Sequence, residues 1–259
     1  MEYSYKKDMK LKDKVKELLI DKTNIKAEDI NEIVDLKGGS SSNENYLVKL
    51  NNGTKYQVKM PDRRMIQSKN NYAYKKYEPT MIKFIGEDGT LIKEWIEGAQ
   101  PDFANKSDCI KVLNEIKQFH KIKPQENTEF EFGLYAYRDT TNISKNLLEE
   151  FDELSKFLEG FPKGFIHGDI NPGNILVNEE KAYLIDLEWS MNGWLVLDYA
   201  YLIAFSNIDP MMVSEFSKYN LTDLQKIVRL VYIHTLMWCE NEETEKANIL
   251  FKEIINKLA

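Results

Sequence analysis

The chain has 259 residues, of which 42% are hydrophobic and 30% charged, as expected for a globular protein with one large domain or two smaller ones. Its formal net charge of −7 argues against a nucleic-acid-binding protein, because such proteins neutralise phosphates with a basic surface. The same charge mildly favours a cationic partner. The longest apolar stretch, residues 194–205, is interrupted by Asp198 and is too short to span a bilayer.

Cysteine usage and the first residues bear on the compartment in which the protein works. Cys109 and Cys239 lie far apart in the chain and form no CxxC pair, so neither a disulfide framework nor a structural zinc site is expected. Residues 1–8 contain no apolar run that could serve as a secretion signal. We therefore expect a cytoplasmic protein that has neither a membrane nor a nucleic acid as a partner.

The first part of the chain is dominated by strand patterns. Residues 11–20 predict a short amphipathic helix with lysines on its outer face. A second helix is expected at 66–79, and strands are expected at 30–36, 46–50, 55–60, 81–85 and 91–95. Asn51-Asn52-Gly53 predicts a tight hairpin turn, because Asn-Gly tolerates positive φ angles.

Helical patterns dominate after residue 98, at 108–122, 143–158, 195–205, 211–218, 221–240 and 244–258. Short strands are expected at 165–166, 175–177 and 182–185. The sequence therefore predicts an α+β protein with a small β-rich N-terminal lobe, residues 1–97, and a larger helical C-terminal lobe, residues 98–259. The two lobes would be joined near residues 95–98.

A group of polar residues between two of the short strands points to chemistry. The segment 165–177 contains His167-x-Asp169-x₄-Asn174, and the apolar-flanked Asp186 follows the next strand. Each residue alone is unremarkable, since an Asp before a Pro-Gly turn usually just forms the turn. Together they suit phosphoryl transfer, which needs an oriented acceptor hydroxyl and a cation on the phosphate oxygens. Asp169 would activate the hydroxyl, Asn174 and Asp186 would bind Mg²⁺ through oxygen, and His167 would brace the loop.

This segment resembles the catalytic and metal loops of the aminoglycoside phosphotransferase/choline kinase superfamily. Members of that superfamily have His-x-Asp where protein kinases have His-Arg-Asp. The resemblance extends over residues 35–238. It implies a bilobal protein-kinase-like fold, ATP and Mg²⁺ as cofactors, nucleotide binding between the lobes, and transfer of the γ-phosphate to an alcohol.

The resemblance also assigns a nucleotide site to the first part of the chain. A Gly-Ser loop between two strands would cover the phosphates, because small residues let backbone N–H groups approach closely. A lysine on the next strand would hold the α- and β-phosphates, and the segment after the last strand would contact adenine. The candidate nucleotide-binding residues are Ser40, Ser41, Ser42, Lys59, Glu94 and Ile96.

The expected partner of Lys59 is a departure from the family pattern. Choline kinases usually place a glutamate on the following helix, where it pairs with this basic residue. In this chain Asn71 falls near that position and Glu78 lies further along. Either the helix has a different register, or Lys59 is held by a hydrogen bond instead of an ion pair.

The sequence leaves two classes of acceptor alcohol, aminoglycosides and choline-like amino alcohols. His-Gly-Asp with Pro-Gly-Asn is the wording common among aminoglycoside phosphotransferases, whereas Ile185-Asp-Leu-Glu-Trp-Ser is close to the choline kinase form. A quaternary ammonium is held by aromatic faces and carboxylates, since it cannot donate an N–H hydrogen bond. The candidate substrate residues are Glu188, Trp189, Trp194, Asp198 and Trp238.

The hypothesis that best fits the sequence is a kinase acting on choline or a related amino alcohol such as ethanolamine. The alternative within enzymes is a phosphotransferase for an aminoglycoside or another hydroxylated metabolite, because an acidic protein would also suit a polycation. The alternative outside enzymes is a non-catalytic kinase fold that only binds. The altered partner of Lys59 supports that last alternative, whereas the presence of Asp169, Asn174 and Asp186 speaks against it.

Overall fold

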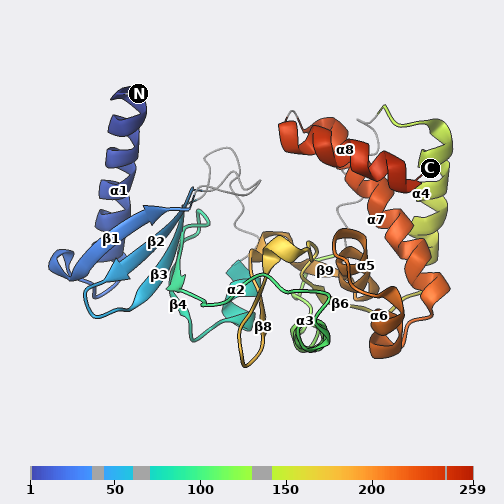
Figure 1. Ribbon diagram of the computed structural model, residues 1–259, viewed down its shortest axis with the longest axis horizontal. Coiled ribbons are helices and arrows are strands. Elements are labelled where there is room, and N and C mark those ends of the chain that lie inside the picture. The colour runs from blue at the N-terminus through green and yellow to red at the C-terminus, as the bar shows by residue number, and fades with distance from the viewer. Residues whose placement is uncertain (1, 37–43, 61–70, 130–141, 243, 259) are drawn as a thin grey trace. The chain divides into compact units, whose positions relative to one another are not determined.

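The computed structural model of the protein describes residues 2–36, 44–60, 71–129, 142–242 and 244–258. The chain divides into two compact units, Met1–Glu97 and Gly98–Ala259 (Figure 1). The division falls where strand patterns give way to helical patterns along the sequence.

The first unit is built on a five-stranded antiparallel sheet with the order β1-β2-β3-β5-β4. Its five strands are expected where apolar and polar residues alternate, and the structure confirms all five to within two residues. Their bounds are Ile30–Asp35 for β1, Glu44–Leu50 for β2, Lys55–Met60 for β3, Ile82–Ile85 for β4 and Leu91–Glu94 for β5. A single 3₁₀ turn, Ala27–Asp29, precedes β1.

The predicted hairpin turn joins β2 to β3. Gly53 has a φ of +86°, a conformation that glycine adopts at little cost. The N–H of Leu50 donates to the carbonyl of Thr54 at 2.8 Å and closes the turn. This register, continued into β5, places Lys59 opposite Leu91.

One face of the sheet is covered by helix α1 (Glu2–Lys22) (Figure 1). Val15 and Leu19 of α1 are fully buried, together with sheet residues that include Val48 and Val58. Because side chains alternate along a strand, Lys59 lies on the opposite face of the sheet from Val58. Helix α1 is longer than the predicted 11–20, because only its second half carries the apolar stripe.

Helix α2 (Asn71–Tyr77) follows β3 in the chain. It occupies part of the segment 66–79 for which a helix was predicted, and residues 66–70 lie outside the described residues. Ala73 and Tyr74 are buried, and α2 contacts β4.

The second unit is mainly helical, and α7 lies at its centre. Helix α7 packs against α4, α5, α6 and α8. Asparagine or aspartate side chains accept from backbone N–H groups at the starts of α3, α6 and α7, which stabilises those starts. The structure confirms all six predicted helices: α3 (Lys106–Phe119), α4 (Lys145–Leu158), α5 (Val196–Phe205), α6 (Pro210–Ser217), α7 (Leu221–Asn241) and α8 (Glu245–Leu258).

Two small antiparallel sheets complete the second unit. Strands β7 (Ile175–Val177) and β8 (Ala182–Leu184) form where strands were predicted, and they pair with each other. Strand β6 (Lys163–Ile166) includes the predicted strand at 165–166. It pairs with β9 (Met191–Trp194), a strand that the sequence analysis did not predict. Gly164 and Gly193 face each other across this pair, and a Cβ on Gly193 would lie 2.5 Å from the side chain of Ile166.

Two further properties follow from the helices and the cysteines. No helix within the described ranges is both long and apolar enough to cross a membrane. Cys109 and Cys239 are free thiols, and both are buried. Burial raises the pKa of the Cys239 thiol to about 11, so little reactive thiolate forms there at neutral pH.

Candidate active site

The polar residues singled out in the sequence lie on the loop after β6 and at the ends of the β7–β8 hairpin. Strand β6 ends at Ile166, and a 3₁₀ turn, Pro172–Asn174, leads into β7. The N–H of Ile185 donates to the carbonyl of Asn174 at 2.9 Å, so the two ends of the hairpin lie together. The hairpin thereby returns Asp186 to the loop, where its charge acts on Asp169.

His167 is fully buried, and both of its ring nitrogens are hydrogen-bonded. Nε2 lies 3.0 Å from the carbonyl of Ile185, and Nδ1 accepts from the N–H of Asp169 at 3.3 Å. Since the carbonyl can only accept, Nε2 carries the proton. His167 therefore links the loop to the chain just before Asp186, with no ring nitrogen left to take a proton from an acceptor.

The carboxylate of Asp169 is held from both sides by amide groups. Asn174 Nδ2 donates to Asp169 Oδ2 at 2.7 Å and to the Asp169 carbonyl at 2.9 Å. Asn171 Nδ2 donates to Asp169 Oδ1 at 3.1 Å. Because a carboxylate oxygen has two lone-pair sites, each oxygen can still accept one more hydrogen bond.

The surroundings of Asp169 favour its protonated form relative to a carboxyl group in water. Burial raises the pKa of Asp169 most, and the nearby charge of Asp186 raises it further. The neighbouring His167 ring and the hydrogen bonds from Asn171 and Asn174 oppose this change without cancelling it. A raised pKa makes the carboxylate a stronger base for an acceptor hydroxyl.

Asn174 presents its amide oxygen away from Asp169. Its Nδ2 must face the carboxylate, because an ionised carboxylate only accepts hydrogen bonds. No described residue donates to Asn174 Oδ1. An amide oxygen of this kind suits a hard cation such as Mg²⁺, and Asp186 directly follows Ile185, whose N–H is hydrogen-bonded to the Asn174 carbonyl.

Asp186 has a left-handed backbone, with φ 60° and ψ 61°. Few residues other than glycine adopt this conformation, and it costs on the order of 1–3 kcal/mol. Asp186 precedes the 3₁₀ turn Leu187–Trp189, but its side chain does not cap that turn. Strain of this type is often found at functional sites.

Gly168 lies where the loop meets the 3₁₀ turn after Asp186. Its φ is +79°, and a Cβ at this position would lie 2.4 Å from the carbonyl oxygen of Trp189. Such a distance is shorter than any van der Waals contact, so a side chain would push the two segments apart. Glycine is therefore required for the close approach of the Asp169 loop to the segment that carries Asp186.

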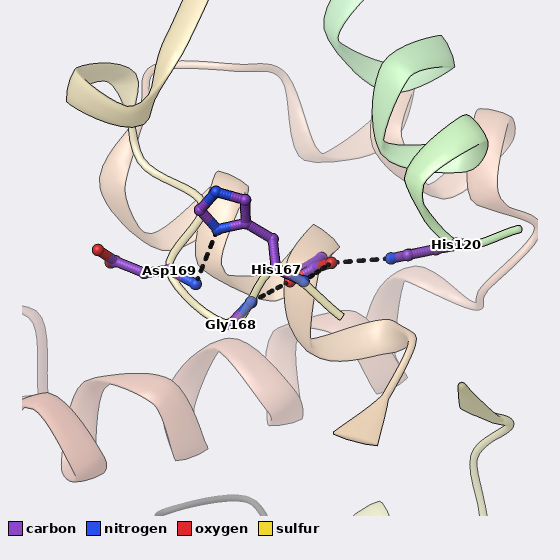
Figure 2. Close-up of polar contacts among 5 residues, drawn as sticks. His120, His167, Gly168 and Asp169 are labelled. Carbon is purple, nitrogen blue, oxygen red and sulfur yellow. Dashed lines mark hydrogen bonds and ion pairs between the residues drawn. The ribbon is translucent and has the colours of Figure 1, made fainter. Parts of the chain in front are cut away.

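Asp198 on α5 fixes the backbone of the same loop (Figure 2). Its Oδ2 accepts from the N–H of His167 at 3.0 Å, and its Oδ1 accepts from the N–H of Gly168 at 2.9 Å. His120 Nε2, at the end of α3, lies 2.9 Å from Oδ2. Asp198 is fully buried, so we move it from the predicted substrate residues to the support of the loop.

The other predicted substrate residues differ in exposure. Trp189 is 39% exposed, directly after the half-buried Glu188, and Trp238 on α7 is half-buried. Trp194 is 5% exposed, and the Lys163 ammonium lies 4.9 Å from its ring centre. Trp194 is therefore largely buried, while Glu188, Trp189 and Trp238 remain candidates for contact with an acceptor.

The predicted nucleotide residues of the first unit are described only in part. Ser40, Ser41 and Ser42 lie outside the described residues. Lys59 is 5% exposed on β3. The N–H of Glu94 donates to Met81, and its carboxylate forms an ion pair with Lys83 at 2.6 Å. The backbone N–H of Ile96 has no hydrogen-bond acceptor among the described residues.

A buried ion pair links the end of α2 to β5. Glu78 Oε2 lies 2.6 Å from Lys93 Nζ, and both side chains are at most 4% exposed. The ring of Tyr74 lies 5.9 Å from the same ammonium. Glu78 thus pairs with Lys93 and not with Lys59, while Asn71 donates to the carbonyl of Gly86 at 3.1 Å.

Sequence reasoning missed His120 and Asn171, which support the Asp169 loop, and Lys93, which forms the buried ion pair of the first unit. His120 and Lys93 belong to no local motif, and their contacts join segments that are distant in sequence. Asn171 lay inside the predicted motif but was assigned no role. A signal for it was present, because asparagine can cap a turn and donate a hydrogen bond at once.

Comparison with known proteins gives consistent matches. Residues 87–227 match the phosphotransferase enzyme family, abbreviated APH. The protein LicA homolog of Mycoplasma capricolum subsp. capricolum is 25% identical over 205 residues, which cover 72% of this chain and 83% of that protein.

Solved structures share the fold. Choline kinase LicA from Streptococcus pneumoniae has a TM-score of 0.70 at 19% identity, covering 97% of this chain and 98% of that one. A choline/ethanolamine kinase family protein from Mesorhizobium loti has a TM-score of 0.72 at 14% identity, covering 95% and 93%. Spectinomycin phosphotransferase APH(9)-Ia, solved with ADP and spectinomycin, has a TM-score of 0.67 at 17% identity, covering 93% of each chain. These likenesses confirm the predicted α+β, protein-kinase-like fold.

Proposed function

The chain belongs to the phosphotransferase enzyme family, and from that premise we propose that it transfers the γ-phosphate of ATP to the hydroxyl of choline or a related amino alcohol. The observation that carries the proposal is the joint geometry of Asp169 and Asn174. One amide holds the carboxylate through its nitrogen at 2.7 Å and turns its oxygen outwards. This arrangement offers a base for the acceptor and an oxygen ligand for a cation within one loop.

Asp169 would accept the hydroxyl proton as the acceptor oxygen approaches the γ-phosphate. Its position is fixed before substrate binds, because both carboxylate oxygens are already hydrogen-bonded and the loop backbone is tied to Asp198. Fixing a reacting group in advance lowers the entropic cost of reaching the transition state. His167 would hold the loop in register with the segment that precedes Asp186.

Mg²⁺ fits the oxygen donors of Asn174 and Asp186. The described residues contain no group of three or more His, Cys, Asp or Glu side chains suited to a metal. A site with one carboxylate and one amide is what Mg²⁺ uses when waters and substrate phosphates fill its remaining positions. When bound, Mg²⁺ would neutralise charge on the phosphate oxygens.

The first unit would supply the remaining contacts to the nucleotide. The ammonium of Lys59 would pair with the α- and β-phosphates, and the N–H of Ile96 would donate to adenine. The open hydrogen-bonding capacity of Ile96 supports this assignment. The loop of Ser40, Ser41 and Ser42 would cover the phosphates, as the family resemblance implies.

Two observations favour a cationic acceptor. Trp189, three residues after Asp186, has an exposed indole ring, and Glu188 beside it adds a carboxylate. An aromatic face and a nearby carboxylate attract a quaternary ammonium, which cannot donate N–H hydrogen bonds. The choline kinase names among the structural neighbours agree with this choice. The presence of spectinomycin phosphotransferase among them keeps an antibiotic acceptor as the second candidate.

The decisive experiment is an ADP-release assay with Mg²⁺-ATP against choline, ethanolamine, kanamycin, homoserine and methylthioribose. Turnover of choline or ethanolamine at a rate well above that of the other compounds is the expected result. Turnover of kanamycin but not of choline would move the protein to the antibiotic class and remove the proposed role of Trp189. Failure to bind ATP at millimolar concentration would favour the non-catalytic alternative.

Replacing the base gives the first mutational prediction. Asp169→Asn removes the proton acceptor but keeps the shape of the side chain, so we expect kcat to fall by about 10²- to 10⁴-fold. The dissociation constant for ATP, measured by calorimetry, should change by less than about threefold, a change in free energy comparable to RT. A variant with the wild-type rate would refute the assignment of Asp169 as the base.

A further inference from the structure

We propose that Asn171 is a positioning residue for phosphoryl transfer, which holds the Asp169 carboxylate through its amide while its carbonyl oxygen fixes the turn that carries Asn174. This inference rests on the proposed function. It concerns a residue that makes no assigned contact with nucleotide, metal or acceptor. It follows from hydrogen bonds that the Asn171 side chain makes in opposite directions: its amide donates to the Asp169 carboxylate and, at 3.3 Å, to the Asp169 carbonyl, and its oxygen accepts from the turn.

The first of these bonds aims the carboxylate. Asn171 Nδ2 lies 3.1 Å from Asp169 Oδ1, while the other oxygen, Oδ2, is held by Asn174. A carboxylate held at one oxygen can still rotate about its own axis, but a carboxylate held at both oxygens has a fixed plane. Its remaining lone pairs then point in set directions, and a base needs such alignment with the acceptor proton.

The second bond fixes the turn. Asn171 Oδ1 accepts from the N–H of Gly173 at 2.9 Å, and the carbonyl of Asn171 accepts from the N–H of Asn174 at 3.0 Å. The side chain therefore caps the 3₁₀ turn Pro172–Asn174 at its first position. One residue thus sets both the direction of the base and the place of the amide oxygen assigned to Mg²⁺.

The choice of residue type distinguishes positioning from capping. Serine, threonine and aspartate also cap turns well, but none of them offers a second arm that donates. Aspartate would in addition set a second carboxylate against Asp169 Oδ1. Any of these residues would serve as the cap alone. Asparagine differs from them because its amide nitrogen can also donate to Asp169, and the proposal rests on this second hydrogen bond.

The chain contains a matched control for the test. Asn105 caps α3 in the same way, by accepting from the N–H of Ser107 at 2.9 Å, and among the described residues it forms no hydrogen bond with the Asp169 loop. Asn171→Ser and Asn105→Ser both keep a capping oxygen and remove the amide. We expect a small change in Tm for Asn105→Ser, since a serine cap is nearly equivalent, and a larger one for Asn171→Ser, which also loses the donor to the Asp169 carboxylate.

Activity should separate the two variants. We expect kcat of Asn171→Ser to fall about tenfold or more with the KM for ATP unchanged, because a hydrogen bond to a charged group is lost. Asn105→Ser should keep the wild-type kcat. Wild-type kcat in a folded Asn171→Ser variant would overturn the proposal.

A second variant covers the case in which Asn171→Ser folds poorly. Asn171→Asp is an equally strong cap, so the turn is retained, but it replaces the donor by a negative charge next to Asp169. We expect its kcat to fall below that of Asn171→Ser at the same KM for ATP. If Asn171→Asp keeps the wild-type kcat, the amide is dispensable and the proposal fails.

A measurement without substrate keeps this inference separate from the proposed function. The change in Tm caused by Asn171→Ser is measured in the wild type and in an Asp169→Ala background, as in a double-mutant cycle. A smaller change in the Asp169→Ala background is expected if the amide acts through the carboxylate, and equal changes would contradict it. If the wild type phosphorylates no acceptor, the proposed function fails, whereas the coupling between Asn171 and Asp169 is tested all the same.

Discussion

Single atoms decide how closely the Asp169 loop approaches the segment after Asp186. Gly168→Ala would place a methyl group 2.4 Å from the carbonyl oxygen of Trp189, at a φ of +79° that alanine tolerates poorly. We expect a loss of about 2–4 kcal/mol in unfolding free energy, because backbone strain and overpacking act together. Chemical denaturation followed by circular dichroism measures this loss, and kcat should fall with it.

Gly53→Ala is the control for the backbone contribution. Gly53 has a similar φ, +86°, but no atom lies within 4 Å of the Cβ that alanine would add. Gly53→Ala should lower the unfolding free energy by only about 1–2 kcal/mol, which is the cost of placing alanine in a left-handed conformation. Equal losses in the two variants would show that the approach to Trp189 is not what requires Gly168.

At the residue scale, the sequence motif predicted candidate reacting groups but not the groups that support them. His167, Asp169, Asn174 and Asp186 stand close together in the chain, so their spacing is visible in the sequence. The partners of Asp198 are set by the tertiary fold, which brings α3 and α5 to the loop. The sequence does not show whether a buried aspartate such as Asp198 contacts a substrate or backbone N–H groups. A substrate contact was predicted for Asp198, and the structure shows backbone contacts.

At the scale of elements, the buried pair Lys93–Glu78 joins the end of α2 to β5. Lys93→Met would leave the Glu78 carboxylate buried without its cation, and Glu78 Oε1 already has no hydrogen-bond donor among the described residues. We expect a loss of about 3–5 kcal/mol in unfolding free energy. The double variant Lys93→Met/Glu78→Leu should recover most of that loss, since no charge remains buried. Urea denaturation of the three proteins provides the comparison.

A surface pair on the same sheet is the control for the loss of charge alone. Lys49 and Glu32 lie 2.8 Å apart, with side chains 38% and 51% exposed. Lys49→Met should cost less than about 1 kcal/mol, because solvent screens exposed pairs. If Lys93→Met were equally mild, the buried pair would contribute nothing beyond a surface contact.

Elements with a clear periodic pattern were predictable, and those stabilised only by tertiary contacts were not. Strand β2 alternates in burial along its length, and strands β1 to β5 were all predicted to within two residues. Strand β9, with the sequence Met-Asn-Gly-Trp, has no such alternation and includes residues of low strand propensity. It forms because β6 lies beside it and because Gly164 and Gly193 allow close packing across the pair.

At the scale of the whole molecule, acid should weaken the fold through Asp198. Burial by itself would raise the pKa of Asp198, but its hydrogen bond and electrostatic interaction with His120, the neighbouring His167 ring and the hydrogen bond from Gly168 hold that pKa below its usual value. A carboxyl group with a lowered pKa stabilises the fold above the pKa that it has when unfolded, and this contribution is lost as the pH falls below about 4. Asp198→Asn should therefore be less stable than the wild type at pH 7, with the difference in Tm narrowing below pH 4.

Asp209→Asn is the matched control for acid stability. Asp209 is exposed and caps α6 by accepting from the N–H of Met211 at 2.9 Å, a role that asparagine fills equally well. In scanning calorimetry, the Tm of Asp209→Asn should equal that of the wild type at every pH. If the Asp198→Asn difference stayed constant down to pH 3, the carboxylate of Asp198 would not be a source of acid sensitivity.

The choice of acceptor is a property of the whole molecule that the sequence leaves open. Glu188 and Trp189 precede β9, and Trp238 lies near the end of α7, so any pocket they share depends on tertiary packing. Aromatic residues at helical spacing occur both in cores and at binding sites. Trp194 shows the difficulty, since it was predicted to contact substrate and is buried.

The exposure of Trp189 has an optical consequence. All four tryptophans lie in the described residues, and Trp189 is the most exposed of them, whereas Trp194 is buried. An indole open to water emits at longer wavelength and collides freely with iodide, so much of the quenchable fluorescence should come from this one ring. A cation resting on that ring would shield it from iodide. If the acceptor binds at Trp189 as proposed, iodide quenching of tryptophan fluorescence would detect its binding without a label, a coupled enzyme or turnover.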